Sequence, residues 1–362
     1  MAGVRIAIVG CGVIGKRHAG VIAARPEVDL VAIADPSAFA KATAARFGVP
    51  CHEDVEQFLA TEQVDGVIVS TPTTDHLSPT MAALDASVSV LVEKPIAASL
   101  EDADRIVARS EERSVPVLVG HHRRYHPQLR QARDILRSGR LGQLVAVCGQ
   151  WTVRKSPEYF SDDWRRTWQA GPTLINLTHD LDSLRYICGD VESVSAEMTS
   201  MVMGTEKEDA AAIVLRFRNG ALGTFVMSDQ TPSPWAWELS TGETPAFPKS
   251  GRNSLRFMGT RASLDFPNLV LWHHGDGPSD WTQPILPQSI PHEPVDAFDL
   301  QISHFAEVAS GRNEPRITAR DGTETLRTTL AVFEAARSGK RVLLCRSGSE
   351  WGAGIGADSF AE

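Results

Sequence analysis

Residues 4–24 read VRIAIVGCGVIGKRHAGVIAA, and this stretch decides how the first part of the chain folds. A short apolar run leads directly into Gly10-x-Gly12-x-x-Gly15, and a helix-like pattern follows. Between a strand and a helix, such glycines allow a tight turn, close approach of the backbone to a pyrophosphate, and close packing of helix on strand. The N-terminus of the helix then faces the anion. The stretch therefore predicts a dinucleotide-binding turn.

Four more short apolar runs alternate with helical patterns up to about residue 120. They read VDLVAIAD, VDGVIVST, VSVLVE and VPVLVG. Their hydrophobicity is continuous rather than alternating, which is typical of strands covered on both faces. We therefore predict an α/β fold that begins with a doubly wound parallel sheet.

Asp35 ends the second of these strands, twenty residues after Gly15. A carboxylate at this place accepts hydrogen bonds from the adenosine ribose, and it repels a 2′-phosphate. Pro36 and Ser37, rather than an arginine, follow it. NAD is therefore favoured over NADP, although the nearby Lys41 keeps NADP open as the less favoured cofactor.

Two later strands end in the polar stretches STPTTDH and EKP. In open α/β sheets ligands bind along the edge where the strands' carboxyl ends lie. We therefore expect Lys94 to point into the nicotinamide crevice, with Pro95 fixing the turn; a cis peptide between them is compatible with this. The alternative is an ordinary surface salt bridge at a strand end. The residues predicted to hold the dinucleotide are Gly10, Gly12, Val13, Ile14, Gly15, Asp35, Thr71, Pro72, His76, Glu93 and Lys94.

The second part of the chain has a different pattern, with hairpin signals between strand-like runs. Asn219-Gly220 suits a type I′ turn, and the Pro- and Gly-rich residues 231–251 predict a long loop. We therefore predict a mainly antiparallel sheet here. The helices expected over the chain include residues 99–112, with Ser99 and Asp102 as a capping box, 127–138 and 319–338.

The stretch GPTLINLTHDLDSLRYICGD, residues 171–190, predicts a helix with two distinct faces. The apolar face comprises Leu177, Leu181, Leu184 and Cys188, and the polar face Asn176, His179, Asp180 and Ser183. The polar face resembles the wall of a site. A single helical histidine is more often structural, so that alternative stays open.

Composition excludes several classes of protein. The formal net charge of −9 argues against a nucleic-acid binder. The five cysteines are scattered without metal-ligand spacing, and we assign no metal. No apolar stretch approaches membrane-spanning length and the N-terminus lacks a signal-peptide pattern, so we expect a cytoplasmic enzyme without membrane partners.

Taken together, several motifs resemble the Gfo/Idh/MocA oxidoreductase family, which includes inositol and sugar dehydrogenases. The resemblance spans roughly residues 3–345, and its most specific element is Glu-Lys-Pro followed by a histidine helix. The motifs are GCGVIGKRHAG, STPTTDH, VEKP, GHHRRYHP, YFSDDWRRTWQAGPTLINLTHDLDSLRYICGD and QISHFAEVASGRNEPRITARDG.

The resemblance implies a fold, an activity and an assembly. It implies an NAD(P)-binding Rossmann domain over residues 1–122 and a C-terminal α+β domain over 123–345, with a large, mainly antiparallel open sheet for substrate binding and oligomerisation. We expect residues 346–362 to form a flexible tail. The implied activity is NAD(P)-dependent oxidation or reduction of a sugar, cyclitol or related polyol, by a homodimer or homotetramer.

Two catalytic residues follow from the resemblance: Lys94 matches the family lysine, and His179 matches its helical histidine. Our hypothesis is that His179 is the principal base or acid, while Lys94 stabilises the charge developing on the same oxygen. Many members carry an aspartate four residues before the histidine, but this chain has Ile175 there. The predicted substrate-binding residues are Asn176, Arg123, Tyr125, Tyr159, Trp164 and Arg165.

Two other functions remain open from the sequence. Some chains that resemble this family use tightly held NAD to cleave glycosides through a transient oxidation. A non-catalytic nucleotide-sensing regulator would keep the Rossmann pocket but would need neither Lys94 nor His179.

Overall fold

The computed structural model describes residues 3–243, 246–293 and 295–344. The described chain divides into two units, residues 3–122 with 297–326, and residues 123–296 with 327–344. The predicted tail, residues 346–362, lies outside the described residues. Within the described part of the chain, no helix is both long and apolar enough to cross a membrane.

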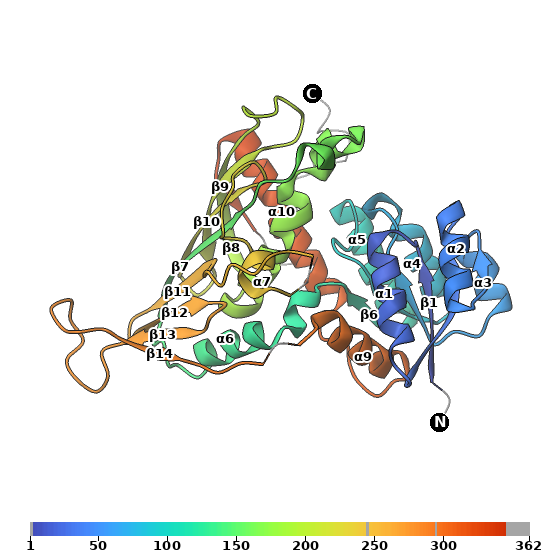
Figure 1. The fold of residues 1–362 in the computed structure, drawn as a ribbon, viewed down its shortest axis with the longest axis horizontal. Coiled ribbons are helices and arrows are strands. Elements are labelled where there is room, and N and C mark those ends of the chain that lie inside the picture. The colour runs from blue at the N-terminus through green and yellow to red at the C-terminus, as the bar shows by residue number, and fades with distance from the viewer. Residues whose placement is uncertain (1–2, 244–245, 294, 345–362) are drawn as a thin grey trace. The chain divides into compact units, whose positions relative to one another are not determined.

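The first unit contains a six-stranded parallel sheet with the order β3-β2-β1-β4-β5-β6 (Figure 1). The Rossmann fold and the five predicted strands are confirmed. β3 was missed because it has only two residues. The strands are β1 (Val4–Val9), β2 (Val28–Ala34), β3 (Cys51–His52), β4 (Gly66–Val69), β5 (Ser89–Val92) and β6 (Val117–Val119).

Helices pack on both faces of this sheet, which explains its continuous hydrophobicity. α9 comes from far along the chain and contacts α1, β1, β4 and β5. The hydroxyl of Ser99 accepts a hydrogen bond from the amide of Asp102, as the capping pattern predicted. The helices are α1 (Val13–Ala23), α2 (Ala38–Phe47), α3 (Val55–Thr61), η1 (Thr73–Asp75), α4 (Leu77–Asp85), α5 (Leu100–Arg113) and α9 (Ala297–Ala309).

The second unit contains a nine-stranded sheet with the order β14-β13-β12-β11-β7-β10-β9-β8-β15. Its neighbouring strands are antiparallel except β7 and β10, so the predicted mainly antiparallel sheet is confirmed. The strands are β7 (Leu144–Thr152), β8 (Val191–Thr199), β9 (Ala210–Phe217), β10 (Leu222–Ser228), β11 (Leu255–Gly259), β12 (Ala262–Phe266), β13 (Val270–His273), β14 (Leu286–Ser289) and β15 (Val342–Leu343).

The helices α6, α7 and α10 lie on one side of this sheet (Figure 1). The predicted helices over residues 127–138 and 319–338 are confirmed. Besides α9, the helical segments after β6 are η2 (His122–Tyr125), α6 (Pro127–Arg137), η3 (Pro157–Phe160), η4 (Asp163–Arg166), η5 (Trp168–Ala170), the π-helical η6 (Thr173–Leu177), α7 (Thr178–Cys188), α8 (Trp237–Thr241) and α10 (Ala319–Ser338).

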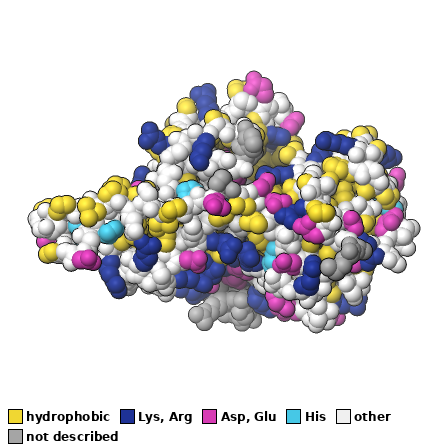
Figure 2. Space-filling model, turned by 60° about the horizontal axis from the view of Figure 1, so that its bottom comes forward, with side chains coloured by type: hydrophobic (Ala, Val, Ile, Leu, Met, Phe, Trp, Pro, Cys, Tyr) yellow, Lys and Arg dark blue, Asp and Glu magenta, His cyan; other side chains and the backbone are white. Residues whose placement is uncertain are grey.

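The described surface carries charges of both signs. Figure 2 shows one face, on which basic and acidic side chains are interspersed. The face in view therefore carries both signs of charge rather than a single-sign field.

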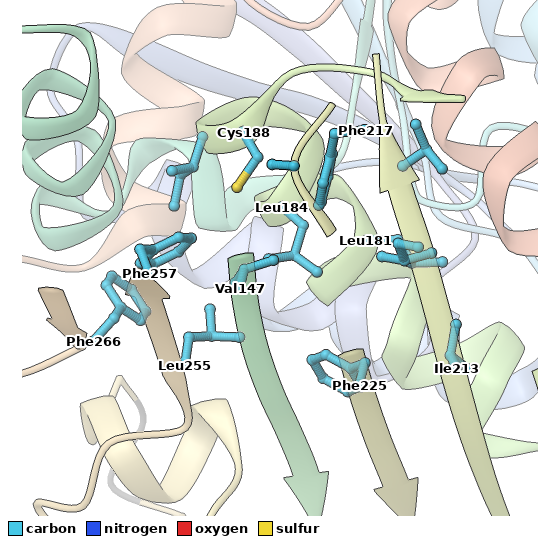
Figure 3. Packing of buried hydrophobic residues seen from close by; sticks show 14 of the residues in the cluster. Val147, Leu181, Leu184, Cys188, Ile213, Phe217, Phe225, Leu255, Phe257 and Phe266 are labelled. Carbon is cyan, nitrogen blue, oxygen red and sulfur yellow. The ribbon is translucent and has the colours of Figure 1, made fainter. Parts of the chain in front are cut away.

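α7 packs its apolar face on the sheet and thereby fixes the position of the histidine helix. Figure 3 shows Leu181, Leu184 and Cys188 among side chains that rise from the strands, including Val147 and Phe225. Each of these five residues is buried. The predicted apolar face of the helix is therefore confirmed.

Two local predictions need correction. The hairpin at Asn219-Gly220 forms, but only Gly220 has a positive φ, so the turn is not type I′. Asn219 uses its side chain instead, donating to the carbonyl of Cys188 and accepting from the amide of Ala221. Residues 231–251 are not entirely loop, because they contain α8, where Trp237 is buried.

Candidate functional site

The glycine turn leaves open space at one position and is tightly packed at two. Gly10 has φ +87°, and a Cβ there would lie 2.5 Å from the amide nitrogen of Thr71. A Cβ on Gly15 would lie 2.1 Å from the carbonyl oxygen of Gly10. By contrast, a Cβ on Gly12 would meet nothing within 4 Å. The turn therefore has room for a ligand beside Gly12.

The N-terminus of α1 opens from this turn. Gly12 is its N-cap, supplies no side-chain cap, and is followed by a first turn without acidic residues. The first amides of a helix have no intrahelical acceptor and favour an anion. Val13 and Ile14 are exposed there. These residues fit the pyrophosphate of a dinucleotide.

Asp35 is held in place next to the glycine turn. Its Oδ2 accepts a hydrogen bond from the amide of Cys11 at 2.7 Å, and its Oδ1 accepts one from the amide of Ser37 at 2.8 Å. Burial works against ionisation, but these bonds, together with one from the Ser37 hydroxyl, lower the pKa of Asp35. An ionised carboxylate with acceptor capacity left on Oδ2 fits a ribose hydroxyl.

His76 connects the loops that follow β4 and β5. Its Nδ1 lies 2.9 Å from the carbonyl oxygen of Pro95, and its Nε2 lies 3.0 Å from that of Thr71. Burial lowers the pKa of His76. The imidazole thus lies between Thr71 on one loop and the turn at Lys94 on the other.

Glu93 is a buried anchor of the turn rather than an exposed member of a surface salt bridge. Its Oε1 lies 2.8 Å from Nε2 of His18, and its Oε2 accepts a hydrogen bond from the Lys94 amide at 3.2 Å. Burial opposes ionisation, but His18 lowers the pKa of Glu93. The Lys94–Pro95 peptide is cis, as the sequence allowed. Lys94 itself is half-buried.

In the second unit, the histidine helix begins with a π-helical turn that carries Asn176. His179 follows in the first turn of α7 and is 8% exposed. Its carbonyl oxygen accepts a hydrogen bond from the Ser183 hydroxyl at 2.8 Å. The predicted polar face exists, but Asp180 and Ser183 on it are buried.

Asp180 belongs to a buried network. Its Oδ1 lies 3.1 Å from Nη1 of Arg123, whose Nη2 lies 3.0 Å from Oε1 of Glu238. Burial raises the pKa of Asp180 to about 7, although Arg123 opposes the shift. Arg123 and Tyr125 are both buried. The network holds α7 and α8 together, and contact of Arg123 or Tyr125 with substrate stays a prediction.

The structure brings the other predicted substrate residues together around a lysine that sequence reasoning missed. Nζ of Lys155 donates to Oδ1 of Asn176 at 3.3 Å and lies 4.5 Å from the ring centroid of Tyr159. The guanidinium carbon of Arg165 lies 4.2 Å from that centroid and 5.2 Å from that of Trp164. The available signal was a lysine just beyond the strand-like run that ends at Val153.

The described residues contain no group of three or more His, Cys, Asp or Glu side chains that could hold a metal ion.

Comparison with known proteins supports this interpretation. Residues 4–121 match the model of the oxidoreductase family with an NAD-binding Rossmann fold, GFO_IDH_MocA, and residues 129–265 match the GFO/IDH/MocA C-terminal domain. Two curated relatives are similar over nearly the whole chain. One is a D-apiose dehydrogenase from Paraburkholderia graminis, 28% identical, with 93% of this chain and 89% of the relative covered.

The second curated relative is scyllo-inositol 2-dehydrogenase (NAD(+)) from Bacillus subtilis. It is 27% identical, with 94% of this chain and 96% of the relative covered. Among solved structures, the WlbA dehydrogenase from Bordetella pertussis in complex with NADH and UDP-GlcNAcA has the same fold. Its TM-score is 0.77 at 24% identity, with 95% of this chain and 99% of that chain covered. The chain belongs to the Gfo/Idh/MocA family of oxidoreductases.

Proposed function

We propose that the protein is an NAD-dependent dehydrogenase that transfers a hydride between nicotinamide and a carbon-bound hydroxyl or keto group of a sugar, cyclitol or related polyol. The observation that carries the proposal is the anchored turn at Lys94, at the carboxyl edge of a sheet whose glycine turn fits a dinucleotide. The names of the D-apiose and scyllo-inositol dehydrogenases support the substrate class.

Proton transfer would be the task of the protein in this reaction. When bound, NAD would supply the hydride acceptor, and the substrate oxygen must lose its proton as the hydride leaves. His179 is the proposed base, and Lys94 donates a hydrogen bond to the same oxygen and stabilises its developing charge. Asn176, Tyr159, Trp164 and Arg165 are proposed to contact the rest of the substrate, with Arg123 and Tyr125 in support.

A substrate screen tests the proposal. Cyclitols, aldoses, sugar acids and their keto forms are incubated with NAD or NADH, and absorbance of the reduced nicotinamide is followed. We expect at least one polyol to reduce NAD catalytically. Failure of every polyol and keto compound to change the absorbance would refute the proposed function.

Asp35 is expected to set the preference for NAD. NAD should bind at least tenfold more tightly than NADP, because the carboxylate accepts from the ribose diol and repels a 2′-phosphate. Asp35→Ala should reduce the difference in affinity between NAD and NADP, because it removes both effects. Titration calorimetry with each cofactor measures the two affinities. Equal affinities in the unmutated protein would contradict the role assigned to Asp35.

We also propose a homo-oligomer that associates through the face of the second sheet opposite α6 and α7. Exposed apolar side chains alternate with buried ones along β9 and β10, and they include Val214, Leu222 and Val226. A hollow of about 340 Å³ at this part of the sheet is lined by residues of β8, β9 and β10, by Ala335 of α10 and by residues 339–341. Exposed apolar patches of this kind mark association surfaces.

Charge placed on this face should dissociate the oligomer. We expect Val214→Arg to give a monomer at micromolar concentration, because it buries an unpaired cation in the interface. Sedimentation velocity measures the change. Val202→Arg is the matched control, since Val202 is exposed in a turn outside the strands. A wild-type monomer at that concentration would contradict the proposal.

A further inference from the structure

Lys155 lies three residues beyond the end of β7, and its side chain is 13% exposed. Nζ donates to Oδ1 of Asn176 at 3.3 Å and lies 3.7 Å from Oδ2 of Asp229. An ammonium group has three N–H donors. These two contacts therefore leave at least one donor for a further acceptor.

Lys207 contacts the same carboxylate, Asp229, and provides a contrast. It is fully buried, and its Nζ donates to both carboxylate oxygens of Asp229, at 3.0 and 3.1 Å, and to the carbonyl oxygen of Glu208 at 3.0 Å. Three acceptors use all three of its donors. Lys207 therefore serves the fold, whereas Lys155 is partly exposed and keeps donor capacity.

Two aromatic rings flank the ammonium group of Lys155. Its Nζ lies 4.5 Å from the ring centroid of Tyr159 and 5.7 Å from that of Trp151. Burial among these rings lowers the pKa of Lys155, while Asp229 opposes the shift. An ammonium group that has lost part of its hydration gains more from a substrate oxygen than an exposed lysine would.

The bond from Lys155 also fixes the orientation of the Asn176 amide. Because Oδ1 accepts from Lys155, the Nδ2 group of Asn176 is directed away from this lysine and remains a donor. Lys155 and Asn176 therefore offer a pair of neighbouring donors. Such a pair suits two oxygen atoms of one ligand.

The charges around these donors are balanced in the described part of the second unit. The cations of this cluster are Lys155, Lys207 and Arg165. Each of them has a carboxylate partner, so the cluster offers no net positive charge to an anionic ligand. The ion pairs are Lys155–Asp229, Lys207–Asp229, Lys207–Asp209 and Arg165–Asp162. Hydroxyl oxygens accept hydrogen bonds without requiring such a charge.

We infer that Lys155 is a further substrate-binding residue, whose ammonium group donates a hydrogen bond to a hydroxyl oxygen of an uncharged polyol and holds Asn176 to bind a second oxygen. This rests on the proposed dehydrogenase function. It narrows the substrate class to sugars and cyclitols without a carboxylate.

Steady-state kinetics of Lys155 variants test the inference. With the best uncharged substrate of the screen, Lys155→Met should raise KM at least tenfold, change kcat less than threefold, and leave NADH affinity and Tm unchanged. Lys155→Gln keeps a donor and should recover part of the loss. Arg154→Gln, a change at an exposed neighbour, is the control and should behave as wild type.

An unchanged KM in Lys155→Met, or a lowered Tm with an unchanged KM, would overturn the inference. D-glucose and D-glucuronate form a matched pair, and we expect the lower KM for the uncharged sugar. If the wild-type protein had the lower KM for D-glucuronate, and Lys155→Met removed that preference, the restriction to uncharged substrates would be wrong. If wild type turns over no polyol, the proposed function fails separately. In that case, calorimetry of myo-inositol binding in the presence of NADH tests the role of Lys155. Equal Kd values in wild type and Lys155→Met would refute a contact between Lys155 and the polyol.

Discussion

Replacing Lys94 by methionine is expected to lower turnover at least a hundredfold and to leave NADH binding near normal. Methionine keeps much of the bulk of the lysine stem but removes the charge and the three donors. The substrate oxygen would then lose the group proposed to stabilise its developing charge. A hundredfold loss corresponds to about 2.7 kcal/mol in activation free energy. Stopped-flow turnover and NADH titration measure the two quantities.

The structure suggests why cofactor binding should survive this change. The turn is anchored through the backbone amide of Lys94 on Glu93, and Glu93 in turn contacts His18, so the ammonium group is not needed for that anchor. Lys249→Met, at an exposed lysine, is the control and should keep full activity. If Lys94→Met lost its fold or its cofactor together with activity, the turn would be structural and the catalytic role would be withdrawn.

His179→Ala is the second large effect that we expect, again at least a hundredfold in turnover. Removing the proposed base takes away general base catalysis, which typically contributes 10²- to 10⁴-fold. A general base must be unprotonated to accept a proton, so protonation of His179 should produce the acidic limb of the pH–rate profile. The residual activity of His179→Ala should therefore lack that limb.

Asp180 is the necessary control for this pH profile, because burial raises its pKa to about 7. Asp180→Asn keeps the shape of the side chain, removes its titration and leaves His179 intact. We expect Asp180→Asn to retain the acidic limb. A limb that disappears in Asp180→Asn and persists in His179→Ala would assign the titration to the aspartate and contradict the proposed base.

The sequence predicted the first unit well because its signals are local. Continuous apolar runs and the glycine turn each lie within a few residues, and so does the cap that Ser99 forms on α5. The Glu93–His18 contact could not be predicted, because 75 residues separate its members and only the sheet brings them together. α9 is similar, since nothing in its own sequence indicates that it packs on β1, β4 and β5.

The second unit shows the same limit at the candidate site. The polar face of the histidine helix follows from helical periodicity, but its burial depends on Arg123 and Glu238, which lie far away in sequence. Lys155 was missed for the same reason. A lysine after a strand usually faces solvent, and only the fold places this one beside Asn176 and Tyr159.

The proposed reaction transfers a hydride from the substrate to NAD, with net formation of a ketone or other oxidised product. The direct measurement uses an active polyol deuterated at its reacting carbon, with NAD added, and analyses reduced cofactor and product by mass spectrometry. We predict NADH that is heavier by one deuterium and one equivalent of oxidised polyol per NADH. A polyol that is cleaved or left unchanged, with no deuterium in the nicotinamide pool, would contradict the account.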